Sequence, residues 1–395
     1  LFRDPAFWDA GWVREHLTPR LMRRLAASGT RAELVACATL LSLAPGPADR
    51  AALMAGFEEA MRGRSLPGLP EELGRALESS GLLTPVLRAR RGDAEALRDM
   101  IRQAGDAAAS AEQRIAAIRL LGEVRPADAA EVLLGVVRSE AAVAVRTAAC
   151  AALSGYDGEG LGTALAAALP GFPVAVRDAA VNLLASRAAW SRALVAAVST
   201  GRLPRGAVPV EVRARMGRHG DPTIEAWLAR QPAVAPAGSS VWRPRIEAVR
   251  KVITATPGDP YRGEPLFMDR CGGCHTLFFK GGKIGPDLTS YQRDDLGTML
   301  ISIIDPNAEI REGYENHLVT TKDGRTLGGF LADQDARVIV LRGYEGTDLT
   351  LARSEVASLD PAGRSLMPEG LLEEYSDQEI RDLFAYLRQS QPIVR

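Results

Sequence analysis

Two thiols and an imidazole lie within five residues of this sequence, at Cys271, Cys274 and His275, with Gly272 and Gly273 as spacers. Each thiol can add across one vinyl group of a porphyrin, and a two-residue gap lets both sulfurs reach vinyls on the same side of the ring. The imidazole directly after Cys274 can then bind the iron through a ring nitrogen. The motif therefore predicts one haem c, covalently held by both cysteines and ligated by His275.

Three other kinds of site also use closely spaced cysteines. A zinc site needs a second ligand pair at short spacing, whereas Cys37 and Cys150 are single, distant and set between alanines, where we expect buried thiols. A thioredoxin-like pair lies between a strand and a helix, whereas Cys271 and Cys274 follow a predicted short helix and precede a glycine-rich loop. A disulfide would leave His275 unexplained. These alternatives stay open, and haem attachment explains the most residues.

The second axial ligand decides whether the iron is closed for electron transfer or open to small ligands. Met268 lies too close to the attachment motif to cross to the other face of a porphyrin. Met299 has an apolar position in a predicted helix, and His317 lies in a predicted strand. Met367 lies in a loop before the last predicted helix, and Pro368 restricts it to an extended backbone. We therefore predict Met367 as the second ligand.

Length and composition indicate a globular protein of several domains. The 395 residues suffice for two or three domains, and 46% hydrophobic with 25% charged residues is ordinary for such a chain. We find no apolar run of about 18 residues, so the sequence predicts no transmembrane helix. The basic residues are spread along helices without interleaved aromatics, so it predicts no nucleic-acid partner.

The start of the chain predicts that it belongs to a longer polypeptide. It begins with Leu1 and shows no signal-peptide pattern. Haem c is attached outside the bacterial cytoplasm, so we expect a signal peptide upstream and a periplasmic or otherwise extracytoplasmic location. The sequence would then be the C-terminal part of the whole protein.

Charge is unevenly distributed along the chain. Residues 258–395 carry 15 basic and 23 acidic side chains, a net charge of −8, and the remaining residues carry a net charge of +7. Opposite signs can favour docking within the chain or two surfaces for different partners. Ordinary variation of solvated charges between domains explains the difference equally well.

Helical periodicity predicts the organisation of the first 244 residues. Residues 1–84 indicate an N-terminal helical region. In 85–230, similar segments begin at Arg114, Arg146 and Arg177, with spacings of 32 and 31 residues. Two helices per unit of this length resemble HEAT repeats, which stack as an α-solenoid. Such an array would serve as a binding face or as a spacer. Residues 231–244, rich in Pro, Gly and Ser, indicate a linker.

Residues 245–395 form the predicted haem domain. Apolar periodicity predicts helices over 259–270, 294–304 and 377–389. Between about 313 and 360 the pattern changes to four short strands, which indicates a β insertion that could form a small barrel. The predicted fold class is therefore mainly α. By resemblance, this implies a HEAT-like α-solenoid followed by a class I cytochrome c-like helical domain with a small β-rich insertion.

Several further motifs accompany the attachment site. They are Gly263-x-x-x-Phe267, Gly285-Pro286-Asp287-Leu288-Thr289, Ile301-x-x-Ile304-Asp305-Pro306, Tyr314, Asp323-Gly324-Arg325 and Ser365-Leu366-Met367-Pro368-Glu369-Gly370-Leu371. With the attachment motif they resemble the PVC-type haem-binding domain, named for planctomycetes and verrucomicrobia, over about 260–390. As in cytochromes c, the resemblance implies that the first and last helices cross. It also implies that the carbonyl of Pro286 lies against the second ring nitrogen of His275.

The resemblance also implies a biological context. Such domains commonly end long secreted proteins, after helical repeats and a β-propeller that resembles sugar or quinone-dependent dehydrogenases. This chain has the helical part and no propeller. The implied partners are a redox donor, such as a dehydrogenase that could be an upstream domain of the same polypeptide, and a redox acceptor protein.

The sequence thus favours a periplasmic c-type cytochrome module that transfers single electrons, rather than a catalyst on its own. One alternative is a five-coordinate haem enzyme, either peroxidase-like or the catalytic part of a sugar or alcohol dehydrogenase. The sequence offers no accompanying set of a second His, an Arg and a carboxylate for its acid–base chemistry. The other alternative is an interaction scaffold in which the solenoid carries the function.

Overall fold

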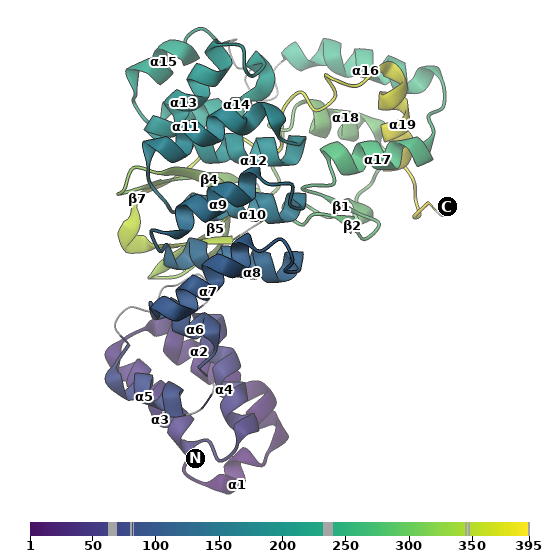
Figure 1. Cartoon of the computed structure of the whole chain (residues 1–395). Coiled ribbons are helices and arrows are strands. Elements are labelled where there is room, and N and C mark those ends of the chain that lie inside the picture. Colours follow the sequence, from purple (N-terminus) through teal and green to yellow (C-terminus); the bar gives the residue numbers. More distant parts are fainter. Residues whose placement is uncertain are drawn as a thin grey trace. The chain divides into compact units, whose positions relative to one another are not determined.

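The computed structural model describes residues 1–61, 69–79, 81, 83–231, 240–343, 346 and 348–393. Contacts divide the chain into two compact units, Leu1–Tyr156 and Asp157–Arg395. Helices dominate both units, and the sheets lie in the second one (Figure 1). The mainly α class with a small C-terminal β region is therefore confirmed, while the solenoid stays a prediction. Within the described ranges, no helix has the length and apolarity needed to cross a membrane.

Every regular element of the first unit is a helix within its described residues. Its helices are α1 (Pro5–Trp8), α2 (Thr18–Ser28), α3 (Arg31–Leu43), α4 (Pro47–Ala60), α5 (Glu71–Ser79), α6 (Pro85–Arg90), α7 (Ala94–Gly105), α8 (Ala111–Val124), α9 (Ala129–Arg138) and α10 (Val143–Leu153), with a π-helical turn at Val13–Leu17. An apolar cluster that includes Trp8, Met22 and Phe57 forms the core of its N-terminal part. Cys37 and Cys150 are fully buried thiols, as the sequence predicts.

The repeated arginines have a structural role in this unit. Nε of Arg114 on α8 donates to the carbonyl of Ala104 at 3.1 Å, and Nε of Arg146 on α10 donates to that of Val137 at 2.8 Å. Both carbonyls lie in the last turn of the preceding helix, where intrahelical donors run out. Each of these two arginines therefore joins its helix to the one before it. Arg177, the third of the series, lies in the second unit.

The second unit contains the remaining helices. They are α11 (Glu159–Ala168), α12 (Val174–Leu184), α13 (Ala188–Ser199), α14 (Val210–Gly217), α15 (Pro222–Leu228), α16 (Arg243–Ala255), α17 (Pro260–Arg270), α18 (Leu296–Ile304) and α19 (Asp377–Leu387). Of the predicted linker, residues 232–239 lie outside the described residues. Residues 240–242 form a 3₁₀ turn, and α16 begins directly after it.

Helices α17 and α19 cross closely at Gly263. A Cβ atom there would lie 2.0 Å from the carbonyl oxygen of Asp382 and 2.7 Å from Cβ of Tyr386. Around the crossing, α16–α19 bury an apolar core that includes Phe267 and Phe384. A side chain at position 263 would push the two helices apart, so glycine is required there by the close approach rather than by backbone conformation.

We expect Gly263→Ala to destabilise the second unit by about 3 kcal/mol, because the overpacked methyl group meets backbone atoms that cannot rotate away. Chemical denaturation would measure the loss. Gly160→Ala in α11 is the matched control, since nothing lies within 4 Å of a Cβ there. Equal stabilities for the two variants would contradict the close crossing.

A five-stranded antiparallel sheet forms the β insertion. Its strands are β3 (Asn316–Thr321), β4 (Thr326–Gln334), β5 (Val338–Arg342), β6 (Asp348–Ala352) and β7 (Val356–Pro361), in the order β6-β5-β4-β3-β7. The sequence predicts only four strands, and β7 is the strand it misses. Because β6 and β7 are edge strands of an open sheet, the small-barrel hypothesis is wrong. A separate two-stranded ribbon joins β1 (Thr276–Leu277) and β2 (Lys280–Gly281).

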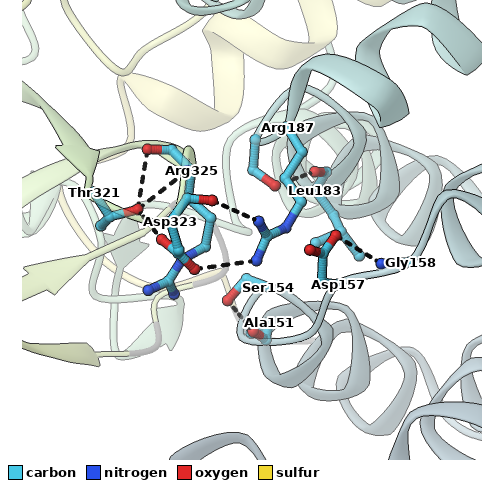
Figure 2. A network of polar contacts seen from close by, with 10 residues as sticks. Ala151, Ser154, Asp157, Gly158, Leu183, Arg187, Thr321, Asp323 and Arg325 are labelled. Atoms are coloured by element: carbon cyan, nitrogen blue, oxygen red, sulfur yellow. Dashed lines mark hydrogen bonds and ion pairs between the residues drawn. The ribbon is translucent and has the colours of Figure 1, made fainter. Parts of the chain in front are cut away.

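The turn between β3 and β4 attaches the sheet to the helices of the same unit (Figure 2). Arg187, just before α13, donates to the carbonyl of Asp323 at 3.2 Å and to its carboxylate at 3.3 Å. Arg325 is only 1% exposed, and its Nε donates to the same carboxylate at 3.0 Å. Burial alone would raise the pKa of Asp323, but hydrogen bonds from Thr321 and Arg325 outweigh it and lower the pKa to about 2. A charged carboxylate therefore lies between two guanidinium groups.

Candidate haem-binding site

The attachment motif forms a tight turn directly after α17. The backbone N–H of Cys271 donates to the carbonyl of Phe267 at 2.8 Å and ends the helix. The N–H groups of Cys274 and His275 then both donate to the carbonyl of Cys271, at 3.1 and 2.9 Å. The turn therefore fixes the backbone of both cysteines and the histidine as one unit, tied to the helix that crosses α19.

The two cysteine side chains are half-buried thiols in two different apolar environments. Cys271 packs against the core formed by α16–α19. Cys274 packs against a second cluster, formed by Ile284, Phe330 and Leu366. Burial raises the pKa of Cys271 to about 12, so this thiol is protonated at neutral pH. The motif thus lies between the helical core and a cluster to which β4 contributes.

The imidazole of His275 is oriented by a backbone carbonyl. Its Nδ1 lies 2.9 Å from the carbonyl oxygen of Pro286. A carbonyl only accepts, so Nδ1 carries the proton and the lone pair is on Nε2. Burial lowers the pKa of His275, although the bond to Pro286 opposes this shift. The ring is therefore neutral at pH 7, with Nε2 available to a metal.

Gly285 brings the loop after the motif against this ring. Its N–H donates to the carbonyl of Cys274 at 2.8 Å. A Cβ atom on Gly285 would lie 2.6 Å from Cε1 and 2.8 Å from Nδ1 of His275. The pair Gly285-Pro286 therefore does two things: the glycine leaves room for the ring and the proline carbonyl orients it.

We expect Gly285→Ala to displace the His275 ring, to cost about 1–3 kcal/mol of stability and to lower the yield of haem-loaded protein, because the ring and the methyl group would overlap. Unfolding curves and haem content would be measured together. Gly273→Ala is the control within the motif, since Gly273 is exposed and a Cβ there meets nothing within 4 Å. If both variants lose stability and haem equally, the packing against His275 is not the cause.

Met367 lies in a loop that contacts the surroundings of the attachment motif through the preceding residue, Leu366. Leu366 is buried in the cluster of Ile284 and Phe330 against which Cys274 packs. Met367 itself is half-buried, and its N–H donates to Oγ of Ser365 at 3.0 Å. The structure therefore brings the loop of Met367 to the cluster that Cys274 contacts.

The other candidate ligands have different surroundings. Met268 is 41% exposed on α17, and its sulfur lies over Gly272, 2.9 Å from where a Cβ would be. Met299 packs against the core of α16–α19. Nδ1 of His317 on β3 lies 3.1 Å from the carbonyl of Glu315. Each of these three side chains thus has a contact unrelated to the cluster against which Cys274 packs.

Sequence reasoning misses Asn307, which bonds to the loop of Met367 on both sides. It is 9% exposed and contacts Ser365 and Glu369. The only signal is a small amide directly after the Asp-Pro that ends α18. Glu211 on α14 is a second missed residue: burial raises its pKa to about 7, and the nearby charge of Glu369 adds to the rise while Arg364 opposes it.

These side chains fit a haem c. Two thiols lie at the spacing that attachment needs, and the tautomer of His275 leaves Nε2 for iron. A ligating histidine whose other nitrogen donates to a carbonyl is the usual arrangement at metal sites. The fit therefore rests on the donor set and its orientation.

Comparison with known families gives a match to the same region. Residues 261–341 match the family model for Cytochrome c. The match includes Cys271, Cys274, His275 and Pro286 and ends before Met367. No curated protein matches the chain. Cytochrome c domains carry covalently bound haem c, transfer electrons to and from redox partners and are typically extracytoplasmic. The match therefore supports a cytochrome c-like haem-binding domain within the second unit.

Proposed function

We propose that this chain is a single-electron-transfer module with one haem c, attached through Cys271 and Cys274 and ligated by His275 and Met367. The observation that carries the proposal is the 2.9 Å contact between Nδ1 of His275 and the carbonyl of Pro286, next to two thiols. When bound, the haem would supply an iron that changes by one electron between the ferrous and ferric states.

The residues of the chain would have separate roles in this module. Cys271 and Cys274 hold the cofactor, so it stays bound in both oxidation states. His275 would hold the iron through Nε2, and the Pro286 carbonyl would keep the ring from turning and raise its basicity. Met367 would supply a thioether as the other protein ligand of the iron, which would favour the reduced state and so raise the potential.

The wider context of the proposal follows the family resemblance. The domains would be 1–84 (N-terminal helices), 85–230 (HEAT-like repeats), 231–244 (linker) and 245–395 (PVC-type haem domain). The whole protein would be secreted to the periplasm and dehydrogenase-like, with this chain as its C-terminal part. Electrons would come from a dehydrogenase, in the same polypeptide or separate, and pass to an acceptor protein.

Carbon monoxide binding separates this function from the alternatives. A six-coordinate carrier should bind the gas slowly in its reduced form and should titrate reversibly as a one-electron couple in spectroelectrochemistry. Rapid binding to the whole population would instead support the five-coordinate enzyme, peroxidase-like or dehydrogenase-type. The interaction scaffold would be supported if the protein shows a normal one-electron couple and keeps its cellular role when that couple is abolished.

A further inference from the structure

A single buried amide, that of Asn307, joins two points of the loop that carries Met367. Its Oδ1 accepts a hydrogen bond from the backbone N–H of Ser365 at 2.8 Å. Its Nδ2 donates to Oε1 of Glu369 at 2.6 Å. Asn307 is 9% exposed, so both bonds are largely shielded from water and are strengthened by the low local dielectric. The two contacts lie two residues before and two residues after Met367.

The contact with Ser365 continues to Met367 itself. Oγ of Ser365 accepts the backbone N–H of Met367 at 3.0 Å. On the other side, Arg364 forms an ion pair with Glu369 and so fixes the carboxylate that Asn307 contacts. Both ends of the short loop are thus hydrogen-bonded to the side chain of Asn307, and the backbone N–H of Met367 is hydrogen-bonded to Ser365 within the loop.

Asn307 is itself attached to a rigid element. The backbone N–H of Asp305 donates to the carbonyl of Ile301 at 2.8 Å and ends α18. The N–H of Ala308 donates to the carbonyl of Asp305 at 2.9 Å, which closes a turn around Asn307. Ile304, in the last turn of α18, is buried in the core of α16–α19. The amide is thus fixed to the helical core from which Cys271 also extends.

We infer that Asn307 is a positioning residue for the second axial ligand: it holds residues 364–369 so that Met367 stays at the iron. This inference rests on the proposed function, since it takes Met367 as the ligand. The position needs one acceptor and one donor in the same small side chain, because Ser365 offers an N–H and Glu369 offers a carboxylate. Asn supplies the two from separate atoms, Oδ1 and Nδ2, so it can contact both partners at once.

The donor and the acceptor of the hydrogen bond between Asn307 and Glu369 can be exchanged by substitution. In Asn307→Asp the side chain still accepts from Ser365, but its second oxygen meets the carboxylate of Glu369, so two like charges face each other. In the double variant Asn307→Asp with Glu369→Gln, the new amide donates to the new carboxylate. Donor and acceptor exchange places, while size and net charge stay the same.

The experiment compares haem-loaded wild type, Asn307→Asp, Glu369→Gln and the double variant. We expect Asn307→Asp to lose most of the weak red band of Met–iron ligation, to lower the midpoint potential and to bind carbon monoxide faster. Hydrogen exchange of the peptide spanning 364–369 should accelerate roughly tenfold or more, since hydrogen bonds with a charged partner are the strong ones. The double variant should recover part of the band and of the slow exchange, because the hydrogen bond between positions 307 and 369 is restored in reverse while the ion pair of Arg364 with Glu369 is lost. Its reference is therefore Glu369→Gln, which lacks the same ion pair.

Asn182→Asp is the matched control in the same unit. Its Oδ1 accepts from Arg215 at 3.0 Å, which a carboxylate keeps, and its Nδ2 donates to the carbonyl of Asp178 at 3.1 Å, which a carboxylate loses. The control therefore also breaks an amide hydrogen bond, but away from the Met367 loop, so the band and the potential should stay at wild-type values. Wild-type band, potential and exchange in Asn307→Asp would overturn the inference, and so would a double variant no better than the single one. A wild-type protein that binds haem covalently but lacks the band would contradict Met367 ligation itself, and Asn307 would then have no ligand to position.

Discussion

Replacing Cys271 and Cys274 together by alanine is expected to leave a protein that folds but carries no covalent haem. The reason is chemical: without thiols, no bond can form to the vinyl groups, and any haem held by His275 alone can be extracted. Intact-mass spectrometry after denaturation and acid extraction would measure the loss of the haem mass. Each single variant should keep one thioether bond and show the spectrum of a haem with one unreacted vinyl group.

Cys37→Ala and Cys150→Ala are the controls for this experiment. Both side chains are fully buried, and burial raises the pKa of Cys37 to about 12, so its thiol is inert. Their combined variant should keep the full haem mass. Covalent haem that persists in the Cys271 and Cys274 double variant would show that the attachment site lies elsewhere.

Replacing Met367 by alanine is expected to leave the haem attached and to open the iron. The variant should lose the weak red band, bind carbon monoxide rapidly and shift its midpoint potential downward by about 0.1 V or more, a fraction of the roughly 0.8 V that axial ligands span. The potential falls because the thioether favours the reduced iron. Optical spectroelectrochemistry measures the band and the potential in one titration.

Two other methionines provide the comparison. Met268→Ala and Met299→Ala should keep the band and the potential, since Met268 is partly exposed beside Gly272 and Met299 packs in the helical core. Met299→Ala should instead cost stability. An unchanged spectrum and potential in Met367→Ala would exclude it as the ligand, and a lost band in Met299→Ala would assign the ligand to α18.

Local signals explain why the helices of the haem domain could be predicted closely. The sequence predicts 259–270, 294–304 and 377–389, and the structure has Pro260–Arg270, Leu296–Ile304 and Asp377–Leu387. Each helix has a strong start signal. Asp259 and Asp295 accept hydrogen bonds from the first turns of α17 and α18, and Ser376 forms a capping box with Glu379 at α19. These signals lie within a few residues of the helix they start.

The missed strand had no such signal. β7 is an edge strand that pairs only with β3, ends at Pro361 and has a half-buried to exposed pattern instead of strict alternation. Proline and weak alternation both argue against a strand when the sequence is taken alone. Pairing with β3 decides the conformation, and that partner lies far away in the sequence.

The contacts of the Met367 loop are also non-local. Asn307 contacts residues that lie 58 and 62 positions later. A motif can indicate that Met367 is available, but not which buried amide holds its loop, because that depends on the tertiary packing of α18. The role of Pro286, by contrast, could be expected from the resemblance, since it depends on residues only 11 positions apart.

The most direct test of the central hypothesis is the visible spectrum of the denatured pyridine adduct, taken from protein matured in a host that attaches haem. The prediction is one haem per chain that stays with the protein after acid extraction, with the absorption of a haem whose two vinyl groups are both saturated. Protein without haem, or haem that is fully extracted, would contradict covalent attachment at Cys271 and Cys274 and return the motif to thiol or metal chemistry.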